Sequence, residues 1–326
     1  MVNNKTLLIT GGTGSFGQKI TDYILKKYKP KKLIIYSRDE LKQYEMSKIF
    51  KHKCLRFFIG DVRDLSRLKF AMREVDYVIH AAALKHVPVA EYNPLECIKT
   101  NIYGAENIIT AALEVGVKRV IALSTDKAAN PINLYGATKL CAEKLFINAN
   151  QLAGSLPTSF SVVRYGNVLN SRGSVIPFFK SLIEKKADHF PLTDKRMTRF
   201  FISLEDSVKF VLDCLKIMKK GEIFVPKMPS MKIIDIAKTL DKTKNIKEIG
   251  IRPGEKINEI LISSDESYST YEYKDFFVIN SLYSSLEKKY KNYNGKKLKS
   301  GFIYSSDKNV NFLNKQKIKN FLFKKI

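Results

Sequence analysis

The feature that most constrains the fold is a glycine-rich turn close to the N-terminus. Residues 5–10, KTLLIT, have the pattern of a buried strand, and glycines follow at Gly11, Gly14 and Gly17. A helix pattern then covers residues 18–27. A strand, a glycine turn and a helix in this order are typical of dinucleotide-binding folds. Glycine lets the backbone approach a pyrophosphate, and the helix N-terminus supplies N–H donors and a positive dipole end. An ordinary tight turn is the weaker alternative.

The chain beyond this turn alternates between strand and helix patterns. Strands are expected at residues 32–36, 55–59, 77–80, 119–123 and 160–164, and one long helix at 93–115. This alternation predicts an α/β fold of Rossmann type, with a doubly wound parallel sheet.

The alternation ends near Arg172. Short elements follow, with a helix starting in 173–179, a strand at 197–202, a helix at 204–219 and a last helix at 314–324. We therefore expect a dinucleotide-binding domain over residues 1–170. Residues 171–326 should form a smaller, mixed substrate lobe and tail packed closely on it.

The tip of the second strand predicts which dinucleotide is bound. An acid at this tip selects the ribose hydroxyls of NAD, whereas an arginine accommodates the 2′-phosphate of NADP. Here Ser37 and Arg38 occupy the tip, and Lys42 follows one helical turn later. The pattern favours NADP; the alternative is that Arg38 is only a solvated residue at a helix start.

Other strand ends add candidate contacts with the cofactor. After the third strand, Asp61 can accept a hydrogen bond from adenine and Val62 can pack on the ring. Small residues at 81–83 let a cofactor lie against the backbone after the fourth strand. His80 is expected to be packed, and Asn101 to bond main-chain groups near the site.

The stretch STDKAANPINLYGATK, residues 124–139, carries the chemistry. It follows a buried strand, and ligands bind at the carboxyl edge of such sheets. Thr125, Asp126 and Lys127 lie together, and Tyr135 and Lys139 are four apart on one helix face. A lysine ammonium one turn from a phenol favours phenolate, which makes Tyr135 a candidate base. Asp126 and Lys127 supply an acid and a base for a second carbon.

Composition excludes several other classes of protein. No apolar run approaches the roughly 20 residues of a membrane span, and the first strand leaves no room for a signal peptide. The four cysteines and the histidines are too scattered for a metal-binding pattern. The wide spacing of the cysteines indicates reduced thiols in the cytoplasm. The net charge of +25 raises nucleic-acid binding as an alternative. The lysines are scattered, however, and the useful part of the positive charge is explained by binding of an anionic nucleotide substrate.

TGGTGSFG together with Tyr135-x-x-x-Lys139 resembles the extended short-chain dehydrogenase/reductase superfamily over the whole chain. Within it, several motifs resemble the UDP-N-acetylglucosamine 4,6-dehydratases that invert C5, of the type used in pseudaminic acid synthesis for flagellin glycosylation. They are SRDELKQYEM at 37–46, HAAALKHVPVAEYNP at 80–94, STDKAANPINLYGATK at 124–139, RYGNV at 164–168, GSVIPFF at 173–179 and MTRFFIS at 197–203.

The resemblance implies a mechanism. Hydride leaves C4 for NADP+ while Tyr135 takes the hydroxyl proton; Lys127 removes the C5 proton, and Asp126 helps the C6 hydroxyl leave as water. Hydride then returns to C6, and protonation on the opposite face inverts C5. Retaining relatives carry Asp-Glu in place of Asp126-Lys127, and simple 4-epimerases need neither group.

The resemblance also implies binding residues. Catalytic groups are Thr125, Asp126, Lys127 and Tyr135. Cofactor contacts are Gly11, Thr13, Gly14, Ser15, Phe16, Gly17, Ser37, Arg38, Asp39, Glu40, Leu41, Lys42, Asp61, Val62, Ala81, Lys85, Leu123, Ser124, Tyr135, Lys139 and Val168. Contacts with UDP-N-acetylglucosamine are Lys85, Lys127, Asn167, Arg172, Val175, Thr193, Arg252 and Glu255. One departure is Asn258 in GEKINE, where relatives often have histidine.

Three alternatives remain beside this reading. A dehydratase of a capsule or O-antigen pathway would run the same chemistry. A catalytically silent NADP-binding regulator would commonly lack the Tyr-Lys pair, which this chain keeps. Nucleic-acid binding is the third. A homo-oligomer is expected, with no membrane, nucleic-acid or metal partner.

Overall fold

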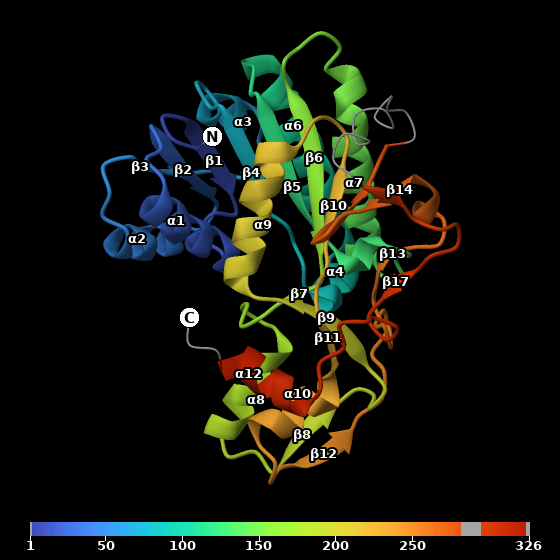
Figure 1. The fold of residues 1–326 in the computed structure, drawn as a ribbon. Coiled ribbons are helices and arrows are strands. Elements are labelled where there is room, and N and C mark those ends of the chain that lie inside the picture. The colour runs from blue at the N-terminus through green and yellow to red at the C-terminus, as the bar shows by residue number, and fades with distance from the viewer. Residues whose placement is uncertain (1, 282–294, 324–326) are drawn as a thin grey trace.

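The computed structural model describes residues 2–281 and 295–323. Figure 1 shows a large lobe built on one twisted sheet and a smaller lobe that carries the C-terminal helix. The largest sheet among the described residues has ten strands, in the order β16-β14-β15-β10-β6-β5-β4-β1-β2-β3. Its first six strands in sequence pair in parallel, which confirms the predicted doubly wound sheet. They are β1 (Thr6–Thr10), β2 (Lys32–Ser37), β3 (Leu55–Ile59), β4 (Tyr77–His80), β5 (Arg119–Thr125) and β6 (Ser159–Tyr165).

The other four strands of this sheet come from beyond residue 170. They are β10 (Ile223–Pro226), β14 (Thr270–Glu272), β15 (Phe276–Ile279) and β16 (Lys296–Lys297). β10 adds in parallel to β6, and β15 then adds antiparallel to β10. The large sheet therefore takes strands from both sides of the boundary predicted from sequence, so that boundary does not separate the sheets.

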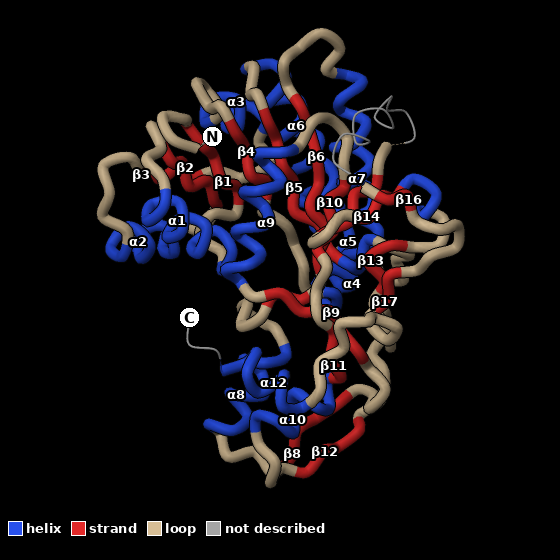
Figure 2. Tube along the Cα trace, in the orientation of Figure 1, coloured by secondary structure: helices blue, strands red, loops and turns tan. Residues whose placement is uncertain are grey.

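Helices cover both faces of the large sheet, as Figure 2 shows. On one face α1 (Ser15–Lys27) contacts α9 (Leu204–Ile217), with α2 (Glu40–Ile49) beside β2 and β3. On the other face α6 (Gly104–Val115) contacts both α3 (Leu65–Ala71) and α7 (Leu134–Leu152). The strands between them are buried on both sides, as the apolar run in β1 requires.

The long helix predicted at 93–115 is not one regular α-helix. α5 (Pro94–Ile98) passes into a π-helical turn (Lys99–Tyr103) before α6, and a separate short helix, α4 (Val87–Tyr92), precedes them. The π-turn places Asn101 at a buried position where its amide both donates to and accepts from the main chain of Leu84. Such π-turns occur often at functional sites.

The smaller lobe has its own apolar cluster, separate from the one under the large sheet. Its helices are α8 (Val175–Glu184), α10 (Ile233–Leu240) and α12 (Lys315–Phe323). Its short strands are β7 (Asn167–Val168), β8 (His189–Leu192), β9 (Thr198–Ile202), β11 (Ser230–Lys232) and β12 (Asn245–Glu248). A further pair, β13 (Ile260–Ile262) with β17 (Tyr304–Ser305), completes the described strands.

The glycine loop has the geometry that its sequence predicts. Gly11 has φ of +64°, in the left-handed region that glycine tolerates. A Cβ on Gly17 would lie 2.2 Å from the carbonyl oxygen of Gly12, so only glycine allows α1 to pack this closely on the turn. Helix α1 begins at Ser15, three residues before the predicted start, because Gly14 already serves as its N-cap.

No helix in the described part of the chain combines the length and the apolar composition needed to cross a membrane.

Candidate active site

A cleft of about 1150 Å³ runs along the carboxyl ends of the parallel strands and reaches the smaller lobe. The glycine loop, the tip of β2 and the ends of β3, β4 and β5 line one part of it. Asn167, Arg172, Val175, Thr193, Arg252 and Glu255 line the rest. Residues far apart in the sequence thus meet in a single cavity.

Nearly all of the predicted site residues line this cleft. Those of the cofactor set are Gly11, Thr13, Gly14, Ser15, Phe16, Gly17, Ser37, Arg38, Asp39, Lys42, Asp61, Val62, Ala81, Lys85, Leu123, Ser124, Tyr135, Lys139 and Val168. Thr125 and Lys127 line it as well. Glu40 and Leu41, the first two residues of α2, lie outside the lining, and Asp126 is fully buried behind it.

The cleft also contains features that fit a dinucleotide. The hydroxyl oxygens of Thr100 and Ser124 are buried without a hydrogen-bond partner, and both residues line the cavity. Buried polar atoms are normally paired, so these two atoms indicate a ligand. Together with the close-packed glycine loop, they fit a nicotinamide dinucleotide lying along the strand ends.

At the tip of β2, the acidic and basic side chains are paired with one another. Asp39 caps α2 by accepting from the backbone N–H of Lys42, and its carboxylate also pairs with the Lys42 ammonium. Arg38 remains half exposed, 3.5 Å from the Asp61 carboxylate. Asp61 is held mainly by Arg63, at 2.7 Å. Asp39 is therefore a neutralised cap rather than a free acceptor for ribose hydroxyls.

Strand β5 is two residues longer than predicted and carries Ser124 and Thr125 to the cleft. A short 3₁₀ turn (Asp126–Ala128) follows. The Thr125 hydroxyl donates to Asp126 Oδ1 at 2.9 Å, and Lys127 Nζ donates to the same oxygen at 3.1 Å. The tight turn thus makes Asp126 accept from both of its neighbours, leaving Oδ2 buried without a partner.

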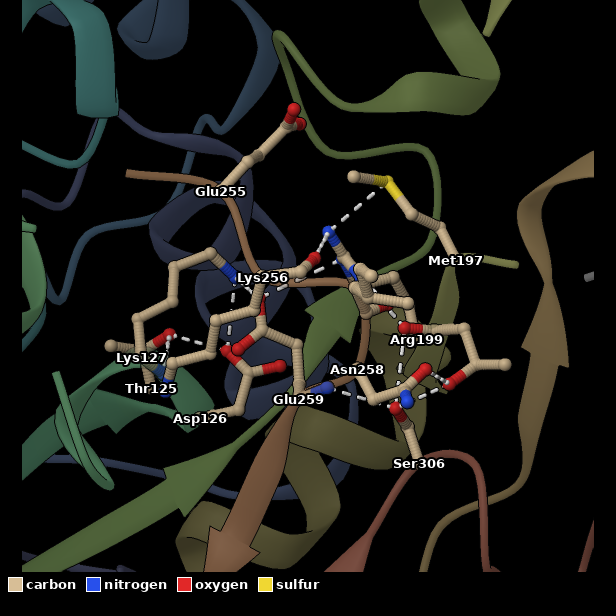
Figure 3. Close-up of polar contacts among 12 residues, drawn as sticks. Thr125, Asp126, Lys127, Met197, Arg199, Glu255, Lys256, Asn258, Glu259 and Ser306 are labelled. Carbon is tan, nitrogen blue, oxygen red and sulfur yellow. Dashed lines mark hydrogen bonds and ion pairs between the residues drawn. The ribbon is translucent and has the colours of Figure 1, made fainter. Parts of the chain in front are cut away.

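Lys127 also contacts a second carboxylate, which sequence reasoning missed. Its Nζ lies 3.3 Å from Glu259 Oε1, and Arg199 Nε approaches the same oxygen at 3.7 Å. Figure 3 shows Lys127 between Asp126 and Glu259, with Arg199 on the far side of Glu259. Glu259 and Arg199 are nearly fully buried and line the cleft. Their signals in the sequence were the motifs GEKINE and MTRFFIS, whose charged residues were not combined with Lys127.

The two carboxylates decide the charge of Lys127. Burial lowers its pKa, but Asp126 and Glu259 raise it by more, so the pKa lies well above its ordinary value. The sequence left the net direction open, because burial and Asp126 act in opposite directions. In the protein without ligands Lys127 is therefore an ammonium ion.

The expectation that Lys139 makes Tyr135 a phenolate is wrong for the protein without ligands. Asn133 caps α7 and so places Tyr135 in its first turn. Burial raises the pKa of the Tyr135 phenol to about 12, and Lys127 and a hydrogen bond with Thr125 lower it only in part. Lys139 Nζ instead donates to the carbonyl oxygen of Leu123 at 2.7 Å. Burial lowers the pKa of Lys139 to about 8.

His80 is packed as predicted. His80 is buried, and its Nδ1 is 2.8 Å from the Thr10 hydroxyl, which also accepts from the N–H groups of Ala81 and Ala82. Burial and the nearby Lys139 lower the His80 pKa to about 3, so His80 stays neutral. Within the described residues, no cluster of His, Cys, Asp or Glu has the arrangement to hold a metal ion.

The smaller lobe is tied to the larger one around the cleft. The backbone N–H of Arg172 donates to the Ser15 hydroxyl at 3.3 Å, and Lys85 Nζ donates to the carbonyl oxygen of Arg172 at 3.2 Å. Asn133 donates to the carbonyl oxygen of Gly254 at 2.7 Å. The first two bonds fix the Arg172 segment beside the glycine loop, and the third fixes the loop that carries Arg252 and Glu255 against the start of α7.

Comparison with known proteins gives consistent relatives. Residues 7–281 match the family described as "Polysaccharide biosynthesis protein". A protein of Campylobacter jejuni subsp. jejuni (strain 81-176), named UDP-N-acetylglucosamine 4,6-dehydratase (inverting), is 58% identical over 98% of this chain and 97% of its own length. A protein of Rickettsia massiliae, named UDP-glucose 4-epimerase, is 45% identical over 86% of this chain and 84% of its own length.

Solved structures show the same architecture. Pen from Bacillus thuringiensis is 39% identical, with a TM-score of 0.92 over 99% of this chain and 98% of its own. DesIV, a dTDP-glucose 4,6-dehydratase from Streptomyces venezuelae solved with NAD and TYD bound, has a TM-score of 0.70 over 77% of this chain and 86% of its own. Its identity of 21% supports the fold alone.

Proposed function

Because the chain belongs to the polysaccharide biosynthesis protein family of extended short-chain dehydrogenases/reductases, we propose that it is an inverting UDP-N-acetylglucosamine 4,6-dehydratase. The chain is an enzyme, since its relatives over nearly the whole length are named as one. The observation that carries the finer proposal is the arrangement around Lys127. It places a lysine, two buried carboxylates and a tyrosine together at the edge of the sheet.

The size of the cleft supports two ligands at once. Its volume of about 1150 Å³ exceeds the roughly 300–1,000 Å³ typical of a pocket for one small molecule. We assign the part lined by the glycine loop to the dinucleotide and the part lined by the smaller lobe to the sugar nucleotide. In this division, residues 1–170 supply most of the cofactor part of the cleft and residues beyond 170 most of the substrate part, although β10 and β14 to β16 belong to the large sheet.

The dinucleotide is proposed to be NADP. Asp39 is occupied by its cap and by Lys42, whereas Arg38 stays half exposed at the cleft, with only a long contact to Asp61. An available guanidinium and no free acid at the strand tip favour a 2′-phosphate over a free ribose hydroxyl. Held along the glycine loop and at Arg38, NADP+ would supply the hydride acceptor for C4 of the sugar and, once reduced, the hydride donor for C6, so no reductant would be consumed.

The chain's own residues move the protons. Tyr135 first releases its phenolic proton, which the charge of Lys127 and the hydrogen bond with Thr125 favour because both lower its pKa, and the phenolate then takes the C4 hydroxyl proton. The C4 carbonyl then acidifies the proton on C5, which Lys127 removes once it has released its own proton. Asp126, once protonated on its unpaired Oδ2, donates that proton to the C6 hydroxyl, which leaves as water. A proton added to the opposite face at C5 inverts that centre.

The substrate's diphosphate is assigned to arginines of the smaller lobe. Arg172 and Arg252 line the cleft, and a planar guanidinium binds phosphate oxygens in a bidentate way. We further propose the first step of pseudaminic acid synthesis for flagellin glycosylation, in the cytoplasm, by a homo-oligomer. Resemblance of YSSDKNVNFLNKQKIKNFL at residues 304–322 to enzymes of that pathway supports this over a capsule or O-antigen route.

A 4-epimerase is the second candidate, because relatives of that name share nearly half of their residues with this chain. The two functions differ in product mass. Incubation with UDP-N-acetylglucosamine, without added NADPH, should give a nucleotide sugar that has lost one water, measured by mass spectrometry. A product of unchanged mass would support the epimerase and contradict the dehydratase.

A further inference from the structure

Glu259 is a buried carboxylate in the cleft to which the proposed mechanism gives no role. It directly precedes β13, and its side chain is 2% exposed. One oxygen, Oε1, contacts Lys127 and Arg199, while the other, Oε2, is buried without a hydrogen-bond partner. A buried carboxylate that keeps one oxygen unpaired is costly to the fold. Its position in the cleft therefore points to a functional reason.

The surroundings of Glu259 are rigid. The Arg199 guanidinium donates to the main-chain carbonyl oxygens of Thr198, Ile257 and Lys256, at 2.7 to 2.8 Å. The backbone N–H of Glu259 donates to the Ser306 hydroxyl at 2.9 Å, and the same hydroxyl lies 2.7 Å from that of Thr198. Figure 3 shows these bonds converging on the segment that carries Glu259. The carboxylate is thus fixed by the smaller lobe while it contacts a lysine of the larger one.

We propose that Glu259 is a positioning residue for Lys127, which fixes the lysine Nζ in the cleft and stabilises the ammonium formed when Lys127 takes a proton from the substrate. The proposal rests on the proposed function. It explains why a second carboxylate lies on Lys127 when Asp126 already accepts from it. Under this proposal Lys127 can act as a base only when Glu259 of the smaller lobe lies against it.

The proton step balances without a further reactant. The resting ammonium first releases a proton to solvent. The lone pair on Nζ then forms an N–H bond with the C5 proton as the C5–H bond breaks, and the electron pair moves toward the C4 carbonyl. Positive charge develops on Nζ, 3.3 Å from Glu259 Oε1. A fixed negative charge at this distance favours that change and makes Lys127 a stronger base.

Other charged groups also face Lys127, and the test has to hold them constant. Asp126 raises its pKa, as Glu259 does, whereas Arg199 lowers it. Tyr135 and Lys256 also interact with it electrostatically. Glu259→Gln keeps the shape and leaves the other four groups in place. Glu259→Asp keeps the charge.

The first experiment measures the protonation of Lys127 directly. Folded protein is acetylated with a trace of acetic anhydride at a series of pH values, and the Lys127 peptide is quantified by mass spectrometry. Loss of an opposite charge at this distance should lower the apparent pKa by about one to three pH units in Glu259→Gln. Glu259→Asp should keep much of the wild-type value. Glu272→Gln, which breaks a Lys–Glu pair on the surface, is the matched control and should change nothing.

The second experiment follows dehydration of UDP-N-acetylglucosamine against pH. In Glu259→Gln the rise of kcat with pH should level off at a lower pH than in the wild type. The plateau value of kcat should be reduced by up to about 10-fold, because the lysine is a weaker base. KM should change less than kcat. A kcat reduced by one constant factor at every pH, with Lys127 acetylation unchanged, would overturn the proposal.

The two experiments separate this proposal from the proposed function. If the wild type does not dehydrate UDP-N-acetylglucosamine, the function fails, whatever Glu259 does to Lys127. If the wild type dehydrates it and Glu259→Gln has a wild-type pH profile, only the role of Glu259 fails. Failure of Glu259→Gln to fold leaves Glu259→Asp, whose weaker contact should give an intermediate apparent pKa; an unchanged pKa and rate there would overturn the proposal.

Discussion

At the scale of single residues, the site is a set of charges that oppose one another at short range. Lys127 is partly buried and yet charged, because two carboxylates outweigh its loss of hydration. At Lys139 burial outweighs the attraction of Glu143, so its pKa falls to about 8. The pKa values of two lysines in one cleft thus shift in opposite directions, because only Lys127 has two carboxylates within 3.3 Å of its Nζ.

The proposed preference for NADP depends on Arg38. Arg38→Ala should weaken the binding of NADP by about 10-fold or more and that of NAD much less, since only NADP carries the 2′-phosphate. Fluorescence titration of the cofactor-free protein measures both affinities. Equal losses for the two cofactors would place Arg38 outside the cofactor site.

Lys139 should make stability depend on pH. Its pKa is about 8 in the folded protein against an ordinary 10.5, so between these values the unfolded chain binds a proton that the folded protein does not. Stability should therefore rise with pH through this range, by up to about 3 kcal/mol in total. Below about pH 8 the folded protein carries the full cost of the buried charge.

Lys139→Met tests this directly. The variant should unfold at a higher denaturant concentration than the wild type at pH 7, and its own stability should rise less between pH 8 and pH 10.5. Lys144→Met, at an exposed position of the same helix α7, is the control and should keep the wild-type slope. A wild-type slope in Lys139→Met would contradict the lowered pKa.

At the scale of elements, one buried ion network joins the catalytic helix to the rest of the fold. Arg164 of β6 is fully buried and donates to Glu143 of α7, at 2.9 Å from Nε, and to Glu266 at 2.8 Å. Glu266 lies in a 3₁₀ turn (Glu266–Ser269) of the C-terminal half. The network therefore links the helix of Tyr135 and Lys139 to a segment more than a hundred residues further along the chain.

Glu143→Ala should destabilise the protein by about 3–5 kcal/mol, because it leaves a fully buried guanidinium with one partner fewer. Glu272→Ala, which removes a surface ion pair with Lys227, should cost about 1 kcal/mol or less. Urea unfolding of both variants measures the difference. Similar decreases in the free energy of unfolding of the two variants would mean that the buried network stabilises the protein no more than a surface ion pair does.

Elements with strong local patterns could be predicted from sequence. The six parallel strands, the glycine turn and the helix of Tyr135 follow from short apolar runs, glycine spacing and a helix pattern, all of which are local. The π-turn between α5 and α6 could not, since one extra residue per turn leaves little trace in a helix pattern. Strands β14 to β16 were also missed, because they are short and their pairing is set by distant contacts.

The candidate site, like the fold, could be predicted only where it depends on local sequence patterns. Residues at strand ends were found, because the sheet topology brings those ends together. Glu259 and Arg199 were missed as partners of Lys127, because their meeting depends on how the smaller lobe folds back on β5. The direction of the Lys127 pKa could not be predicted without that contact.

At the scale of the whole molecule, the cleft requires both lobes. The larger lobe provides the glycine loop, Lys127 and Tyr135, while the smaller one provides Arg252, Glu255 and Thr193. The hydrogen bond from Asn133 to Gly254 fixes the Arg252 loop to the start of α7. In the proposed function, this bond joins the loop assigned to the substrate's diphosphate to the helix that carries Tyr135.

Arg252→Lys should raise KM for UDP-N-acetylglucosamine by about 10-fold and leave kcat nearly unchanged, since lysine cannot copy bidentate phosphate binding. Steady-state kinetics of product formation measure both constants. Lys247→Arg, at an exposed position of β12 in the same lobe, is a matched control and should keep the wild-type KM. An unchanged KM in Arg252→Lys would place Arg252 outside the substrate site.

The central claim, inverting dehydration at C5, is tested most directly by NMR of the product formed from UDP-N-acetylglucosamine in deuterated water. The wild type should give a 4-keto-6-deoxy sugar with deuterium at C5 and couplings that correspond to the inverted centre. Lys127→Ala should bind NADP but release no such product. A C4 epimer without deuterium, or a 4-keto sugar with C5 retained, would contradict the account.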